Sequence, residues 1–96
     1  MRTKTRGESW EDLLPSPGDG PDALYAREAM LNELAEAVQE LSEPQRAVFI
    51  AHEVDGKSFR ELAEQTGVSV NTLLSRKHAA VRHLRKRLQA MVENWD

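Results

Sequence analysis

The sequence predicts an all-α domain of four helices, with a long last helix. Apolar residues recur at helical spacing, and no segment alternates between apolar and polar residues as a β-strand does. Residues that begin or end helices separate the apolar segments, at Pro21, Ser42, Gly56 and Gly67. The chain after Gly67 contains neither glycine nor proline, which favours one long helix there.

Size and composition limit the possible functions. The 96 residues suffice for one small domain, and 40% hydrophobic and 30% charged residues are typical of a folded helical protein. The absence of cysteine excludes a disulfide framework and fits a reducing cytoplasm. The longest apolar run, residues 47–51, is far shorter than the roughly 20 residues of a transmembrane helix. We therefore expect a cytoplasmic protein with no membrane segment.

Charge is distributed unevenly along the chain. Residues 1–21 hold three basic and four acidic residues, and residues 22–56 hold two basic and eight acidic ones. Residues 57–96 hold eight basic and four acidic residues, and none of the acidic ones lies within residues 68–92. Electrostatic attraction depends on the local surface more than on the total charge, so the C-terminal part is predicted to bind a polyanion. The acidic middle would face away from DNA or toward a basic protein.

The first 21 residues are predicted to form a flexible linker, and residues 22–96 to form the domain. Three prolines and two glycines fall within residues 15–21, and few side chains here are large enough to fill a core. This composition favours a fragment that begins in the linker of a longer protein, with a stand-alone protein as the alternative. The other hypothesis for the segment is a short peptide that binds through Trp10, Leu13 and Leu14.

Helix one is predicted from Pro21 or Asp22 to about Leu41. Proline suits the first turn of a helix, and an acidic side chain there is stabilised by the positive end of the helix dipole. The expected apolar stripe consists of Leu24, Leu31, Leu34, Val38 and Leu41.

Helix two is predicted to follow Ser42 and to reach about Val54. The serine is a suitable N-cap, since its hydroxyl accepts a hydrogen bond from the first turn. Pro44 stands in that turn, where no intrahelical hydrogen bond is lost. Asp55 and Gly56 then break the chain.

Helix three is predicted from Phe59 to about Thr66. Ser58 and Glu61 form a capping box, in which the serine accepts from a backbone N–H three residues on and the glutamate reaches back. This helix is short and ends at a glycine, as the first helix of a helix-turn-helix does.

Helix four is predicted to begin after its N-cap, Ser69, and to reach Val92 or beyond. The small Ala63 permits close helix approach, Gly67 can adopt the positive φ of the turn, and Leu73 anchors helix four on helix three. The last two helices therefore form a helix-turn-helix. The expected buried face of helix four consists of Leu73, Ala80, Leu84, Leu88 and Met91.

The other face of helix four carries the candidate DNA-binding residues. The N-terminal residues of the second helix of this motif reach base edges in the major groove, and free N–H groups of its first turn attract phosphate. The candidates are Asn71, Ser75 and His78 for bases, Arg76 and Lys77 for guanine or phosphate, Ser69 and Thr72 for phosphate, and Arg82, which begins a basic run with Arg85, Lys86 and Arg87.

No catalytic, metal or cofactor site is predicted. His52 and Glu53 begin an HExxH zinc motif, but Gly56 stands where the second histidine is required. His78 has no neighbouring ligands in the sequence, and no glycine-rich phosphate loop or nucleophile spacing occurs. We therefore do not expect an enzyme.

The segment from Leu41 to Leu88 resembles region 4 of sigma-70 family factors, and most of all the small extracytoplasmic-function group. The family pattern is roughly LPxxxRxVFxLxxxxGxSxxEIAxxxGxSxxTVxSRxxRAxxxLxxxL, and helix one suits the helix that precedes it. Identical or conservative matches are Leu41, Arg46, Val48, Phe49, Gly56, Ser58, Glu61, Leu62, Ala63, Gly67, Ser69, Thr72, Leu73, Ser75, Arg76, Ala80, Leu84 and Leu88.

The resemblance implies that helix four recognises the promoter −35 element and that the domain docks on the flap of the RNA polymerase β subunit. An anti-sigma factor often covers such surfaces in the extracytoplasmic-function group. The acidic first two helices would then belong to the protein-binding side. The promoter-opening region 2 of this family is not found in the sequence, so we expect either a fragment that begins in the interdomain linker or a sigma-like protein without melting activity. The proline- and glycine-rich start favours the fragment.

Several positions depart from the family pattern. Ser42 replaces the usual proline, with Pro44 two residues later, which changes little. Lys77 stands where leucine is usual on the buried face, and its stem is expected to lie along apolar surface with its charge in water. Ala79 and Val81 replace residues that are commonly basic, and Leu74 stands where lysine is frequent. Fewer phosphate contacts are therefore expected, with Leu74 and Val81 partly exposed as a contact for a partner or a second copy.

Two other functions remain open. A protein-interaction module would bind an anti-sigma factor or the polymerase without reading DNA, and the apolar Leu74, Ala79 and Val81 favour it. The output domain of a response regulator has a similar arrangement of four helices and usually dimerises through its last helix. Binding to the polymerase flap would separate a sigma-like domain from this output domain, since only the former should bind there.

Overall fold

The computed structural model describes residues 14–15, 18 and 20–94. No strand occurs in these residues, and the four predicted helices are all present, which confirms the all-α prediction. Most of the expected linker, with Trp10 and Leu13, lies outside the described residues. None of the described helices is long and apolar enough to cross a membrane. The elements are α1 (Pro21–Glu40), α2 (Glu43–Phe49), the π-helix η3 (Ile50–Val54), α3 (Phe59–Thr66) and α4 (Val70–Glu93).

The predicted apolar stripe of α1 is wrong at two positions. Leu24 and Leu31 are 49% and 38% exposed, whereas Met30 and Ala37 are buried beside Leu34. Residues 30, 34 and 37 follow the spacing i, i+4, i+7, so the face that packs on α4 is rotated by about one residue from the predicted one. The small Ala37 lies on that face and lets the two helices approach closely, while Leu31 is left outside the core.

α2 begins at the predicted cap but does not remain α-helical to Val54. The Ser42 hydroxyl accepts a hydrogen bond from the Gln45 N–H, and the Gln45 side chain accepts one from the Ser42 N–H, both at 3.3 Å. After Phe49 the helix widens into η3, and the Asp55 N–H donates to the Ile50 carbonyl, five residues earlier, at 3.0 Å. The wider turn lies in η3, which contacts α4 through its side chains.

The helix-turn-helix forms as predicted. The Ser58 hydroxyl accepts from the Glu61 N–H at 3.0 Å, and the Glu61 carboxylate accepts from the Ser58 N–H at 2.9 Å. Gly67 ends α3 with φ 77° and ψ 4°, a left-handed conformation that costs glycine little, and its N–H donates to the Ala63 carbonyl at 2.9 Å. The chain then turns into α4, so α3 and α4 are separate helices.

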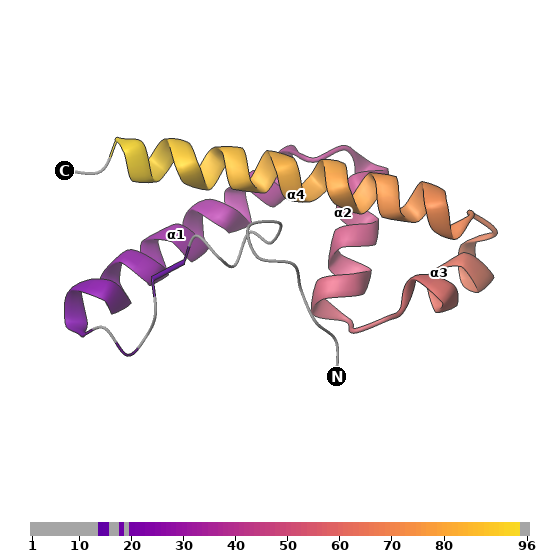
Figure 1. Cartoon of the computed structure of the whole chain (residues 1–96), viewed down its shortest axis with the longest axis horizontal. Coiled ribbons are helices and arrows are strands. Elements are labelled where there is room, and N and C mark those ends of the chain that lie inside the picture. The colour runs from indigo at the N-terminus through magenta and orange to yellow at the C-terminus, as the bar shows by residue number, and fades with distance from the viewer. Residues whose placement is uncertain (1–13, 16–17, 19, 95–96) are drawn as a thin grey trace.

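α4 is the helix on which the others pack (Figure 1). α3 packs near its N-terminal end, α1 packs along its middle and C-terminal part, and α2 lies between them. Its predicted buried face is confirmed, with Met91 only partly buried. One core cluster joins Leu73 to Val48 and Leu62, and a second joins Ala80, Leu84 and Leu88 to Met30, Leu34, Ala37, Leu41 and Phe49.

Candidate nucleic-acid interface

The N-terminal end of α4 is built to attract an anion. The Ser69 hydroxyl accepts a hydrogen bond from the Thr72 N–H at 3.2 Å and donates to the Thr72 hydroxyl at 3.0 Å. The cap satisfies the Thr72 amide, and the amides before it have no partner within the helix. No acidic residue stands in the first turn, so the positive end of the helix dipole is not neutralised there.

One stripe of polar side chains runs along the outer face of α4. Asn71, Ser75, His78 and Arg82 are all exposed, and their spacing of four, three and four residues places them on the same face. Arg76 is half-buried on the flank of this stripe. The structure therefore brings these predicted residues together with Ser69 and Thr72 on one surface at the front half of α4, which we call the α4 outer face.

Lys77 does not belong to the α4 outer face, and its prediction as a DNA-binding residue is corrected here. The residue is only 7% exposed, because it follows Leu73 by four positions and precedes Ala80 by three on the inner side of the helix. The sequence led us to expect the ammonium of Lys77 in water, and the structure shows that it is not. The Nζ atom lies 3.0 Å from the Glu53 carboxylate and 2.7 Å from Nδ1 of His52.

Aromatic rings complete the surroundings of Lys77. Its Nζ lies 5.8 Å and 5.9 Å from the ring centres of Phe49 and Phe59, within cation–π range. The His52 ring stacks on Phe59 with 4.3 Å between centres. Since an ammonium only donates hydrogen bonds, Nδ1 of His52 accepts, and the ring proton is placed on Nε2. Lys77 thus ties α4 to η3 and α3 and positions the helix that carries the outer face.

His52 and Glu53 hold Lys77 in place, and the sequence analysis does not assign them this role. It considers them only as part of an incomplete zinc motif. The signal that could have found them is Lys77 itself, because a lysine on the inner face of a helix requires an acidic partner.

The basic run at the back of α4 divides between two sides. The Arg87 guanidinium is bonded to the Glu33 and Glu40 carboxylates of α1, and His83 Nε2 lies 2.8 Å from Glu40. Hydrogen bonds from Arg87 and then from His83 hold the pKa of Glu40 below its ordinary value, and the same carboxylates raise the pKa of Arg87. Arg87 therefore binds α1 and does not extend the α4 outer face, while Lys86 is exposed.

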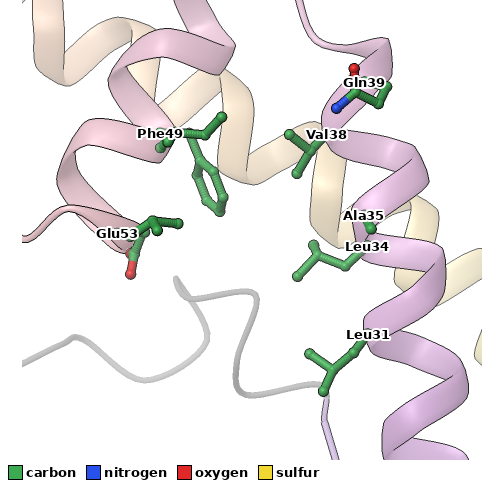
Figure 2. Close-up of a pocket in the computed structure, with 9 residues that line it drawn as sticks. Leu31, Leu34, Ala35, Val38, Gln39, Phe49 and Glu53 are labelled. Atoms are coloured by element: carbon green, nitrogen blue, oxygen red, sulfur yellow. The ribbon is translucent and has the colours of Figure 1, made fainter.

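An apolar groove lies away from the α4 outer face, between α1 and the α2–η3 segment (Figure 2). Its volume is about 490 Å³, within the range of small-molecule sites. Leu31 and Val38 of α1 face Phe49 of α2 across it, and Glu53 of η3 lies at its edge. Glu53 thus borders the groove while its carboxylate holds Lys77 of α4.

No metal site occurs in the part of the chain that the structure describes: no group of three or more His, Asp or Glu side chains there could hold an ion. His78 in particular stands on the α4 outer face among Asn71, Ser75 and Arg82, none of which is a carboxylate or thiolate.

Comparison with known families gave one match that bears on this geometry. A family model described as "Sigma-70, region 4" matches residues 31–84, which is more than half of the chain. The match runs from the middle of α1 through the helix-turn-helix to Leu84 of α4. Comparisons with curated proteins and with solved structures gave no match.

Proposed function

Since this chain belongs to the sigma-70 region 4 family, we propose that it reads the −35 element of a promoter with α4 and docks on RNA polymerase with α1 to η3. Region 4 is a DNA-binding helix-turn-helix region of sigma factors, which act in transcription initiation and are not a known enzyme family. The extracytoplasmic-function type, the anti-sigma partner and the cytoplasmic location stay predictions, as do the individual residue roles.

The observation that carries the proposal is the α4 outer face. A helix held on its neighbour by Leu73 presents Asn71, Ser75 and His78 outward at its front, where this motif reaches base edges. Amide, hydroxyl and imidazole groups all form hydrogen bonds with base edges. We assign direct base contact to these three residues.

Phosphate contacts follow from the surrounding groups. The first turn of α4, with Ser69 and Thr72, offers a positive helix end to one phosphate. Arg82 lies two turns further along the same stripe and reaches the backbone of the duplex. Arg76, on the flank, contacts either a guanine edge or a phosphate.

The docking side is assigned to the opposite surface. Residues 22–56 hold eight acidic and two basic residues, so this surface repels DNA. It also contains the groove and the exposed apolar side chains Leu31, Ile50 and Val54. Apolar contact area bordered by acidic residues suits a protein partner with an apolar surface and basic neighbours, and we assign it to the polymerase β flap.

The test is DNA binding by the full chain, measured as fluorescence anisotropy on a duplex selected from random sequences. Affinity should fall steeply with salt, because bound phosphates release counterions. Arg76→Ala should cost about 1–3 kcal/mol of binding free energy on the selected site if Arg76 reads a base. Arg82→Ala should weaken binding to all DNA sequences and reduce the slope of log affinity against log salt concentration by about 1.

Arg87→Gln is the matched control, since its guanidinium lies on the same helix but faces α1. It should leave the affinity of the folded protein unchanged. Binding without salt dependence, or equal losses for Arg82→Ala and Arg87→Gln, would contradict the proposal.

A protein-interaction module without DNA reading is the second candidate, because the groove and the exposed apolar residues beside it favour a protein partner. This candidate predicts that the β flap or an anti-sigma factor binds while a promoter duplex does not, even at low salt. The same anisotropy experiment therefore separates the two.

A further inference from the structure

Leu74 is an apolar side chain on the flank of a surface that is otherwise polar or basic. It follows Asn71 by three residues and precedes His78 by four, so it lies beside both of them on the surface of α4. Arg76, two residues further on, occupies the opposite flank. The α4 outer face thus has a basic flank at Arg76 and an apolar flank at Leu74.

The core does not account for a leucine at this position. Leu74 is half-buried, yet within the described part of the chain it packs against neither of the two core clusters. Val81 lies on the same flank two turns later and does pack against the second cluster, which includes Ala80 and Leu84. An apolar side chain without a core contact, beside a surface assigned to DNA, is suited to an apolar group of the duplex.

The major groove presents such a group, the C5-methyl of thymine. Leu74 lies in the second turn of α4, and the N-terminal residues of this helix reach base edges in the motif. Leucine also replaces the lysine that is frequent here in the family, whose charge would bind the phosphates of any sequence. A contact common to all sequences is therefore replaced by one that depends on the base.

We propose that Leu74 contacts the C5-methyl group of one thymine in the major groove and makes α4 specific for thymine at that base pair. This rests on the proposed function and adds a specificity-determining residue to it. Because the contact buries one methyl group, it should favour thymine over the same base without its methyl by roughly fourfold in affinity. The contact involves no charge, so it adds nothing to the salt dependence.

Replacement of thymine by uracil tests the proposal at the level of one methyl group, since the hydrogen-bonding groups of the base pair stay the same. Fluorescence anisotropy of the full chain is measured on the selected duplex and on duplexes in which each thymine in turn is replaced by deoxyuridine. One replacement should lower the affinity by roughly fourfold. The slope of log affinity against log salt concentration should not change.

Leu74→Ala should weaken binding to the thymine duplex and bring it level with the deoxyuridine duplex. The four combinations of protein and duplex form a double-mutant cycle, whose coupling isolates the contact between side chain and methyl group. Leu74→Lys should also lose the preference for thymine, but it should gain a phosphate contact and steepen the salt slope by about 1. Circular dichroism checks that each variant is folded.

Val81→Ala is the matched control. Val81 is half-buried and apolar like Leu74 and lies on the same flank of α4, but it packs on the core. Its loss should leave the preference for thymine over deoxyuridine at roughly fourfold, whatever it does to the stability of the fold.

Equal binding of the thymine and deoxyuridine duplexes at every position, or a selected site without thymine, would overturn the proposal and leave the proposed function intact. A preference for thymine that persists in Leu74→Ala would assign the methyl group to another residue and overturn it too. Unchanged DNA binding by Leu74→Ala with weaker binding to the β flap would make Leu74 a protein contact instead. Absence of DNA binding by the parent protein would refute the proposed function as well.

Discussion

Lys77 acquires its role from the face of the helix on which it lies. Placed between Leu73 and Ala80 on the inner side of α4, its ammonium is removed from water and held by Glu53 and His52. A buried ion pair gains little net stability over an apolar pair of similar volume, but loss of one partner leaves a buried charge without compensation. The pair is therefore best understood as fixing how α4 meets η3.

Lys77→Leu should lower the free energy of unfolding by roughly 3 kcal/mol, because the Glu53 carboxylate then remains nearly buried without its partner. Lys77→Leu combined with Glu53→Gln should recover to within about 1 kcal/mol of the parent protein, since no buried charge is left. Urea denaturation of the three proteins measures both values. A double variant as unstable as the single one would contradict the ion-pair explanation.

Glu40 makes stability depend on acid pH. Its pKa is below the ordinary value of 4.5 in the folded protein, because Arg87 and then His83 donate hydrogen bonds to it. The unfolded chain therefore binds this proton more tightly, and protonation favours unfolding. The stabilisation is fully present above pH 4.5 and is lost as the pH falls through the lowered pKa.

Thermal unfolding of the parent protein and of Glu40→Gln measures this contribution. Both are compared at pH 6 and at a pH roughly 1–2 units below the ordinary pKa of glutamate. The parent should lose more stability than Glu40→Gln over that interval. Parallel curves would show that the contacts of Glu40 with α4 contribute nothing to the pH dependence. Glu61, whose pKa the Ser58 N–H lowers, titrates in both proteins and cancels in the comparison.

At the level of elements, the sequence is most informative where the causes are local. The caps at Ser42, Ser58 and Ser69 and the glycine turn at Gly67 involve residues three or four positions apart, and all four form as predicted. The rotated face of α1 depends on packing against α4, and nothing in the local sequence explains the π-helical form of η3. Propensity and spacing within one helix do not contain that information.

Gly67→Ala should destabilise the protein by about 1 kcal/mol, because φ is 77° and an alanine is strained there. Apart from Gly67 and its two neighbours in the chain, no residue has an atom within 4 Å of an added Cβ, so the cost comes from the backbone alone. Gly67→Asn should cost less, since asparagine tolerates this conformation better. Chemical denaturation of both variants tests the order; an alanine variant as stable as the parent would show that the turn relaxes.

The candidate site, like the fold, has one part that the sequence predicts and one part that it does not. Ser69, Asn71, Thr72, Ser75 and His78 were predictable because position in the motif and helical spacing place them outward together. Lys77 and Arg87 were not, because partners on η3 and α1, far away in the sequence, turn their charges inward.

On the scale of the whole molecule, charge and apolar surface are separated. The front half of α4 carries the polar and basic outer face, while α1 to η3 carry the acidic residues and the groove. Acidic residues of α1 also neutralise Arg87, which confines the accessible positive charge of α4 to its outer side. Under the proposed function, the DNA-binding surface and the protein-binding surface are therefore different surfaces of one small domain.

The central claim is that the α4 outer face meets the duplex, and amide NMR of the full chain titrated with a selected promoter duplex tests it most directly. The account predicts that the largest shift changes fall on residues 69–82, at Asn71, Ser75, His78 and Arg82, while Leu31 and Val54 of the groove change little. Changes confined to the groove and to α1, with the front of α4 unaffected, would contradict it.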